Sequence, residues 1–139
     1  MRRRPHRYLP HTADLLVEAR GSDLPELFAR CVDALFSVIS DRRYVRPRET
    51  RTVAVRADTP EDQLYLLLRA ALLLFSADRF LARTARVTMK NDVVVLSVAG
   101  EPSDFARHPI GREVKAVTAH ALTVRETRDG IVARFVVDI

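Results

Sequence analysis

Residues 59–77 read TPEDQLYLLLRAALLLFSA, and this stretch decides the fold because it predicts a helix that is apolar on almost every side. Thr59 is a good N-cap, Pro60 suits the first turn, and the two acids that follow favour the positive end of the helix dipole. The apolar run covers 64–75 and is broken only by Arg69. That is too short for a bilayer, which takes about 20 residues. We therefore expect a core helix, either buried on more than one side or covered by a partner.

A second helix is predicted upstream, where apolar residues recur with helical spacing. Its apolar face consists of Leu24, Leu27, Phe28, Cys31, Val32, Leu35, Phe36 and Ile39. Asp23 and Glu26 favour its N-terminus. Cys31 falls on this face and is the only cysteine, so we expect an inert buried thiol rather than a nucleophile or part of a cysteine zinc site.

Alternating apolar and polar residues predict six strands around these helices. The strands are expected at 13–20, 50–57, 85–89, 93–99, 113–126 and 131–139. Turn residues at 90–92 and 127–130 indicate two hairpins. The order β-α-β-α-β-β-β-β predicts an α+β fold, a two-layer sandwich in which a mainly antiparallel sheet carries both helices on one face.

The composition is that of an ordinary globular protein, with 47% hydrophobic and 29% charged residues. A length of 139 residues fits one domain, 1–139, in which 1–6 form a flexible basic arm. No apolar run of signal-peptide length follows this arm, so we expect a cytoplasmic protein without a membrane partner. The formal charge of +5 favours RNA, or a protein bound to RNA, over a membrane as the partner.

Motifs of common enzyme classes are missing from the sequence. There is no glycine-rich phosphate loop, no GxSxG and no HExxH. His11, His108 and His120 lack flanking residues that would support a catalytic triad. The remaining candidates for chemistry are scattered carboxylates.

One group of carboxylates is expected at the end of the last strand. Asp138 and the carboxylate of Ile139 would lie within a few ångströms of each other, and they would repel unless a cation or an arginine lies between them. Ca²⁺ or Mg²⁺ prefers such oxygens and would accept a third from Asp14. The alternative is that these groups simply face water, and the residues alone leave both interpretations open.

Three segments together resemble the archease family. They are HTAD at 11–14, GEPSDFARHPIGREVKAVTAHALTV at 100–124 and VVDI at 136–139. The resemblance covers essentially the whole chain, with the motifs in the family's order. Archeases assist the GTP-dependent RNA ligase that joins tRNA exons.

The resemblance implies a non-catalytic protein cofactor rather than an enzyme. It would promote guanylylation and multiple turnover of the ligase in tRNA splicing or RNA repair, and would meet tRNA only through the ligase. The implied divalent metal ion is Ca²⁺, or else Mg²⁺ or Mn²⁺, and Lys115 is implied in activating the ligase. The implied metal ligands are Asp14, Asp138 and Ile139, and the supporting residues are His11, Thr12, His108 and Glu113.

The chain departs from the family pattern at three positions. Pro10 stands where most relatives have aspartate, and Leu66 and Ala70 stand where relatives commonly have acids. If those acids complete the metal shell, this chain should bind its ion more weakly. Two other classes of function stay open from the sequence: a small metal-dependent hydrolase, and an RNA-binding or chaperone-like module.

Overall fold

The computed structural model describes residues 14–139, so the predicted basic arm at 1–6 lies outside the described residues. The chain runs in the predicted order, with one short 3-10 turn added. Its elements are β1 (Asp14–Gly21), α1 (Leu24–Ile39), η1 (Arg42–Tyr44), β2 (Glu49–Arg56), α2 (Pro60–Asp78), β3 (Phe80–Lys90), β4 (Val93–Pro102), β5 (Ala116–Thr127) and β6 (Gly130–Asp138).

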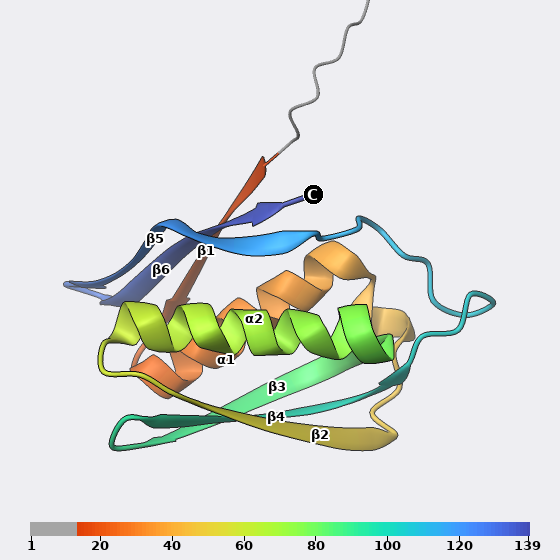
Figure 1. Cartoon of the computed structure of the whole chain (residues 1–139), viewed down its shortest axis with the longest axis horizontal. Coiled ribbons are helices and arrows are strands. Elements are labelled where there is room, and N and C mark those ends of the chain that lie inside the picture. Colours follow the sequence, from red (N-terminus) through yellow and green to blue (C-terminus); the bar gives the residue numbers. More distant parts are fainter. Residues whose placement is uncertain (1–13) are drawn as a thin grey trace, which may run out of the picture.

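The strands form two antiparallel sheets, and the two helices lie between them (Figure 1). One sheet has the order β1-β6-β5 and the other β2-β4-β3. The α+β class and the antiparallel pairing are therefore confirmed. The arrangement differs in one respect: the helices are covered by sheet on both sides, where a single sheet with both helices on one face was expected.

The apolar surface of α2 explains this arrangement. A helix that is apolar all round must be covered on more than one side, and α2 has buried residues from Gln63 to Phe75. Its buried residues are Gln63, Leu64, Leu67, Leu68, Ala71, Leu72, Leu74 and Phe75. Among the large apolar residues of α2, Leu73 is the exposed exception, with 60% of its surface exposed. The interpretation of α2 as a core helix is confirmed, and no helix within residues 14–139 is long and apolar enough to cross a membrane.

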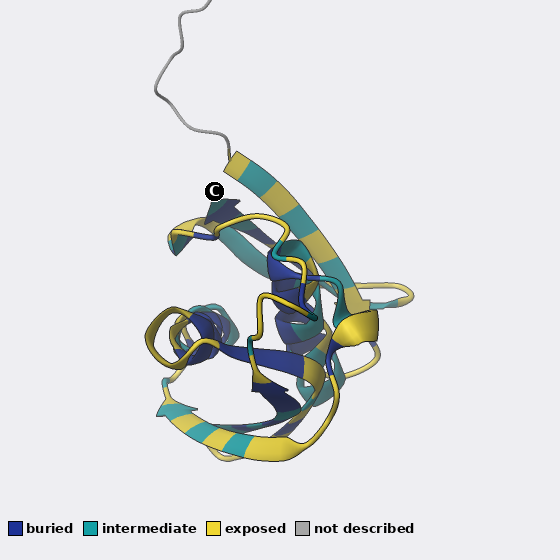
Figure 2. Ribbon diagram, turned by 90° about the vertical axis from the view of Figure 1, so that its right-hand side faces the viewer, coloured by how far each residue is buried: buried dark blue, intermediate teal, exposed yellow. Residues whose placement is uncertain are grey.

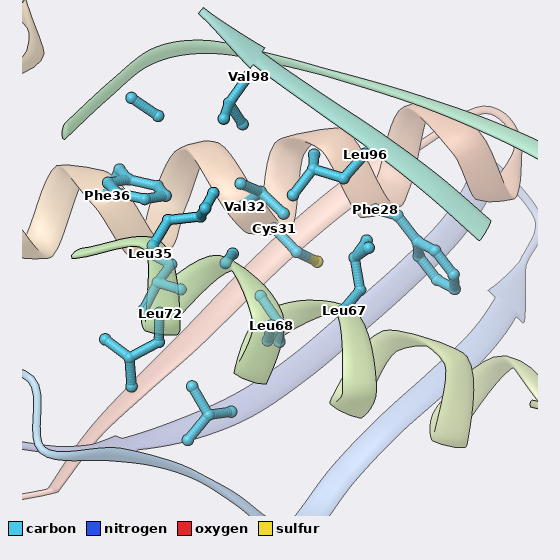
Figure 3. Close-up of a cluster of buried hydrophobic side chains, with 14 of the residues drawn as sticks. Phe28, Cys31, Val32, Leu35, Phe36, Leu67, Leu68, Leu72, Leu96 and Val98 are labelled. Carbon is cyan, nitrogen blue, oxygen red and sulfur yellow. The ribbon is translucent and has the colours of Figure 1, made fainter. Parts of the chain in front are cut away.

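The core is built from both helices and the sheets that flank them. Figure 3 shows side chains from three elements in contact: Phe28, Cys31, Val32, Leu35 and Phe36 of α1, Leu67, Leu68 and Leu72 of α2, and Leu96 and Val98 of β4. Burial raises the pKa of the Cys31 thiol to about 12. The thiolate is therefore disfavoured, as expected for a structural cysteine.

The β3–β4 hairpin is longer than the alternation predicted. β3 begins at Phe80 rather than 85, and β4 continues to Pro102. The register shifts between Ala82 and Thr84, which interrupts the two-residue period from which the strand was predicted. Gly100 lies opposite this irregularity, and a Cβ there would be only 1.9 Å from the main-chain oxygen of Leu81. A glycine is therefore required at this position, because a side chain would collide with the backbone of β3.

Replacing Thr59 tests the predicted start of α2. Its hydroxyl accepts a hydrogen bond from the N–H of Asp62 at 3.2 Å. Thr59→Ala should lower the free energy of unfolding by about 1 kcal/mol, because one N–H of the first turn loses its acceptor. Thr59→Ser keeps the cap and should be close to wild type in urea denaturation. Equal losses in both variants would show that the hydroxyl does not stabilise the helix.

Candidate metal and partner site

The strand register brings the two predicted aspartate ligands together. Asp14 of β1 pairs directly with Asp138 of β6, and Asp138 pairs on its other side with Ala116 of β5. Directly opposed residues of an antiparallel pair place their Cβ atoms about 5 Å apart on the same face of the sheet. The start of β1 and the end of the chain accordingly lie next to each other in Figure 1.

These aspartates lie on the face of the sheet that points away from the helices. Figure 2 shows β1 alternating between exposed and half-buried residues, and Asp14 belongs to the exposed set. The neighbouring pair, Leu15 with Val137, belongs to the inner face, where Val137 is fully buried. Asp14 and Asp138 therefore face outward, at the end of the β1-β6-β5 sheet.

Asp138 contains a buried oxygen that lacks a partner. The side chain is half-buried, and its Oδ1 atom makes no hydrogen bond within the part of the chain that the structure describes. A buried carboxylate oxygen without a partner is costly, and a second carboxylate directly opposite adds repulsion. A bound cation would compensate both, so this pair of residues fits a divalent ion.

The available donors point to a hard cation. Within residues 14–139, no three His, Cys, Asp or Glu side chains are grouped so that they could hold a metal ion. Two carboxylates alone would have to be supplemented by main-chain oxygens or water, and Ile139 directly follows Asp138. An all-oxygen donor set suits Ca²⁺, Mg²⁺ or Mn²⁺ better than a metal that prefers sulfur or imidazole.

Lys115 adjoins this pair through its backbone. Its N–H donates to the main-chain oxygen of Asp138 at 2.7 Å, while its side chain is exposed. The same lysine lines a hollow of about 640 Å³ together with Leu66, Ala70 and Leu73 of α2. Leu66 and Ala70, the two positions at which acids were expected from the family resemblance, thus line this hollow together with Lys115.

His108 is buried in the loop between β4 and β5. Its Nδ1 accepts a hydrogen bond from the N–H of Asp104 at 2.8 Å, and its Nε2 lies 2.9 Å from Glu101 Oε2. Since Nδ1 is the acceptor, the proton is on Nε2 and is donated to the carboxylate. This is the geometry of a residue that braces the loop.

Glu101 is the buried acid that sequence reasoning did not include among the site residues. It is only 2% exposed, and it accepts hydrogen bonds from the Arg107 guanidinium (2.7 Å), the N–H of Arg46 (2.8 Å) and His108. Burial raises the pKa of Glu101, but these hydrogen bonds outweigh it and lower the pKa to about 2. A signal for this cluster was present in the sequence, since Glu101 and His108 both belong to the GE…H part of the archease motif.

The segment before β5 is held against the end of α1. The N–H of Gly111 donates to the main-chain oxygen of Ile39 at 2.7 Å, and that of Arg112 to Val38 at 3.2 Å. Glu113 is exposed in the stretch between this anchor and Lys115. The position of Lys115 is thus constrained from both sides, by α1 and by Asp138.

The predicted supporting residues His11 and Thr12, together with Pro10, lie outside the described residues. Among the described site residues, the structure places Asp14, Asp138 and Lys115 at one end of the β1-β6-β5 sheet. His108 belongs to the separate cluster around Glu101.

Comparison with known proteins identifies the class of protein that this fold represents. The chain matches the Archease protein family (MTH1598/TM1083) over residues 6–139. It is similar to the protein archease of Thermococcus gammatolerans, with 35% identity over 100% of both chains. It is also similar to the protein archease-like of Drosophila melanogaster, with 33% identity over 86% of this chain and 79% of that protein. The chain therefore belongs to the archease family.

Solved structures agree with this assignment. The solution structure of Methanobacterium thermoautotrophicum protein 1598 has a TM-score of 0.74 and 27% identity, and the match covers 94% of this chain and 96% of that one. A crystal structure from Thermotoga maritima, described as an archease and possible chaperone, also has a TM-score of 0.74, with 18% identity over 99% and 100% of the two chains. At 18% identity, the similarity to the Thermotoga maritima structure supports the fold alone.

Proposed function

We propose that this archease is a non-catalytic, metal-binding cofactor of a GTP-dependent RNA ligase. It would promote guanylylation and multiple turnover of the ligase in tRNA splicing or RNA repair, and it would meet tRNA through the ligase. The observation that carries this proposal is the direct pairing of Asp14 with Asp138, whose buried Oδ1 has no partner among the described residues. Membership in the archease family supports it.

The metal ion would be held by the carboxylates of Asp14 and Asp138 and by a main-chain oxygen of Ile139. The positive charge of a divalent ion would neutralise the two opposed carboxylates of this chain. In nucleotidyl transfer, such an ion neutralises the negative charge of the phosphates. In this chain, the β1–β6 register holds the two aspartates face to face. The hydrogen bond from Lys115 to Asp138 keeps the lysine at the same end of the sheet.

Lys115 would contact the ligase from this end of the sheet. Its side chain is exposed, and it borders the hollow that contains Leu73, the exposed large apolar residue of α2. An ammonium group beside apolar surface suits a partner that offers a carboxylate or phosphate next to an apolar side chain. Residues of this chain perform no bond-making step in this scheme.

A ligation assay tests the proposal. The RNA ligase of the same organism should pass through many more turnovers with the protein than without it. The chain has only two lysines, so Lys115→Ala and Lys90→Ala form a matched pair. We expect the concentration of Lys115→Ala needed to stimulate the ligase to rise about tenfold or more. A tenfold change corresponds to the loss of about 1.4 kcal/mol of binding free energy, as for one charged contact. We expect Lys90→Ala to stimulate the ligase as wild type does, because Lys90 is the last residue of β3, in the other sheet.

Two outcomes would contradict this scheme. If wild-type protein does not change ligase turnover, the proposed function is wrong. If Lys115→Ala stimulates as well as Lys90→Ala does, Lys115 does not contact the ligase. Hydrolysis of phosphoesters by the isolated protein with Mn²⁺ or Mg²⁺ would instead favour the metal-dependent hydrolase.

A further inference from the structure

Three arginines surround a hollow on the outer face of the β1-β6-β5 sheet. Arg20, Arg125 and Arg134 line this hollow of about 440 Å³, and its apolar floor includes Leu16, Ala121 and Val132. We call it the arginine hollow. The helices lie against the opposite face of this sheet, which leaves the outer face uncovered by any other described element (Figure 1).

The register fixes how the three arginines are spaced. Arg20 of β1 and Arg125 of β5 both pair with Val132 of β6, so they flank it on either side. Two strand spacings place their Cα atoms about 10 Å apart. Arg134 lies two residues along β6, about 7 Å from Val132. The three guanidinium groups therefore form a triangle around an apolar centre, on neighbouring strands of one sheet.

Positive charge is in excess in the arginine hollow. Glu18 is the nearby acid, and it lies 3.3 Å from Arg20 Nη2 and 3.1 Å from Arg134 Nε. Arg125 makes no ion pair with any residue from 14 to 139, and none of the residues that line the hollow is acidic. Exposed pairs such as those of Glu18 contribute little free energy, so the two arginines can exchange this acid for another anion.

We propose that the arginine hollow binds the phosphodiester backbone of a single-stranded nucleic acid. A guanidinium group donates two parallel hydrogen bonds to a phosphate, and three such groups on a rigid sheet meet successive phosphates of an extended strand. The apolar floor accommodates the sugar or base between them. No other described element covers this face of the sheet, so a polymer can pass across it from one strand to the next.

Binding here depends on phosphate contacts and not on base stacking. The residues that line the hollow include no aromatic side chain, so it lacks the stacking platforms that many single-strand binders use. Affinity is therefore largely independent of sequence and falls steeply with salt. Binding at this surface is measured without a ligase, so it does not depend on the proposed ligase role. Its arginines are separate from the aspartate pair, because Arg20 lies six residues along β1 from Asp14 and Arg134 lies four residues along β6 from Asp138.

Fluorescence anisotropy with a short labelled oligouridine tests this surface at several salt concentrations. Three phosphate contacts on a single strand should give a log–log salt slope of about −2. Arg125→Glu should weaken binding about tenfold or more and make this slope shallower by about 0.7 or more. Arg86→Glu is the matched control, because Arg86 is an exposed strand arginine on the other sheet, and it should cost much less.

Further probes separate the possible sources of negative charge. Oligothymidine that binds within a few-fold of oligouridine supports recognition of the backbone. Polyglutamate that binds more tightly than oligouridine, with the same loss in Arg125→Glu, would overturn the proposal in favour of an acidic protein segment. Saturable binding of inorganic phosphate without binding of oligonucleotide would reduce the hollow to a small-anion site. Equal weakening by Arg125→Glu and Arg86→Glu would show that only net charge matters.

Discussion

Asp138→Asn is expected to abolish both divalent-metal binding and stimulation of the ligase, while making the metal-free protein slightly more stable. Asp14 and Asp138 are opposed in register, and like charges in this position are destabilising. Removing one charge relieves a repulsion worth roughly 0.2–1 kcal/mol. Thermal unfolding should show a small rise in Tm in the presence of chelator. Addition of Ca²⁺, Mg²⁺ or Mn²⁺ should raise the Tm of wild type but not of the variant.

A metal site predicts that Asp138→Asn raises the Tm in chelator and removes the rise in Tm on metal addition. A purely structural role of Asp138 predicts a lower Tm in chelator. Asp129→Asn is the control, because this exposed aspartate lies in the β5–β6 turn, at the far end of the sheet. It should respond to metal as wild type does and should stimulate the ligase fully. If Asp138→Asn lowers the Tm in chelator and keeps the metal response, the aspartate pair is not a cation site.

Glu101→Ala is expected to cause the largest loss of stability, about 3–5 kcal/mol in the free energy of unfolding. The substitution leaves the Arg107 guanidinium, the Nε2–H of His108 and the N–H of Arg46 without their common acceptor. Denaturant unfolding measures the effect. Glu49→Ala, which removes only an exposed ion pair with Arg51, should change stability by less than about 1 kcal/mol. Equal effects of the two substitutions would contradict the structural role of Glu101.

The same cluster predicts a dependence of stability on pH. The pKa of Glu101 is lowered to about 2 from its usual 4.5, so the folded state binds this proton more weakly than the unfolded state does. Its contribution is fully present above about pH 4.5 and is lost as the pH falls towards 2. Glu101→Gln lacks this ionisable carboxyl group. The difference in the free energy of unfolding between wild type and variant should therefore shrink as the pH falls from 4.5 to 2. A constant difference from pH 6 to pH 2 would contradict the lowered pKa.

Periodicity predicted the order of helices and strands because it reports which side of each element is apolar. It does not report which strands pair. β1 pairs with β6, nearly the whole length of the chain away, and this non-local pairing divides the strands into two sheets. The start of β3 escaped prediction for a local reason, since the register shift near Ala82 interrupts the alternation.

The site was predictable to different extents. The proximity of Asp14 and Asp138 followed from the resemblance of the two chain ends to a known family, and the register confirms that they are neighbours. The burial of Glu101 could not be predicted from its own surroundings. Its partners Arg46 and Arg107 come from separate segments, and an acid at a strand end is ordinarily exposed.

The pairing of β1 with β6 also determines when this fold can be completed during translation. β1 is synthesised before its partner strand β6, which follows every other described element. Until then, the backbone N–H and C=O groups of β1 lack their partner strand. An unpaired strand edge can associate with other chains. The acidic pair and the arginine hollow form only when β6 has been inserted between β1 and β5. A chain whose synthesis has not reached β6 therefore presents neither surface, and both surfaces mark a chain in which β6 has been made and paired.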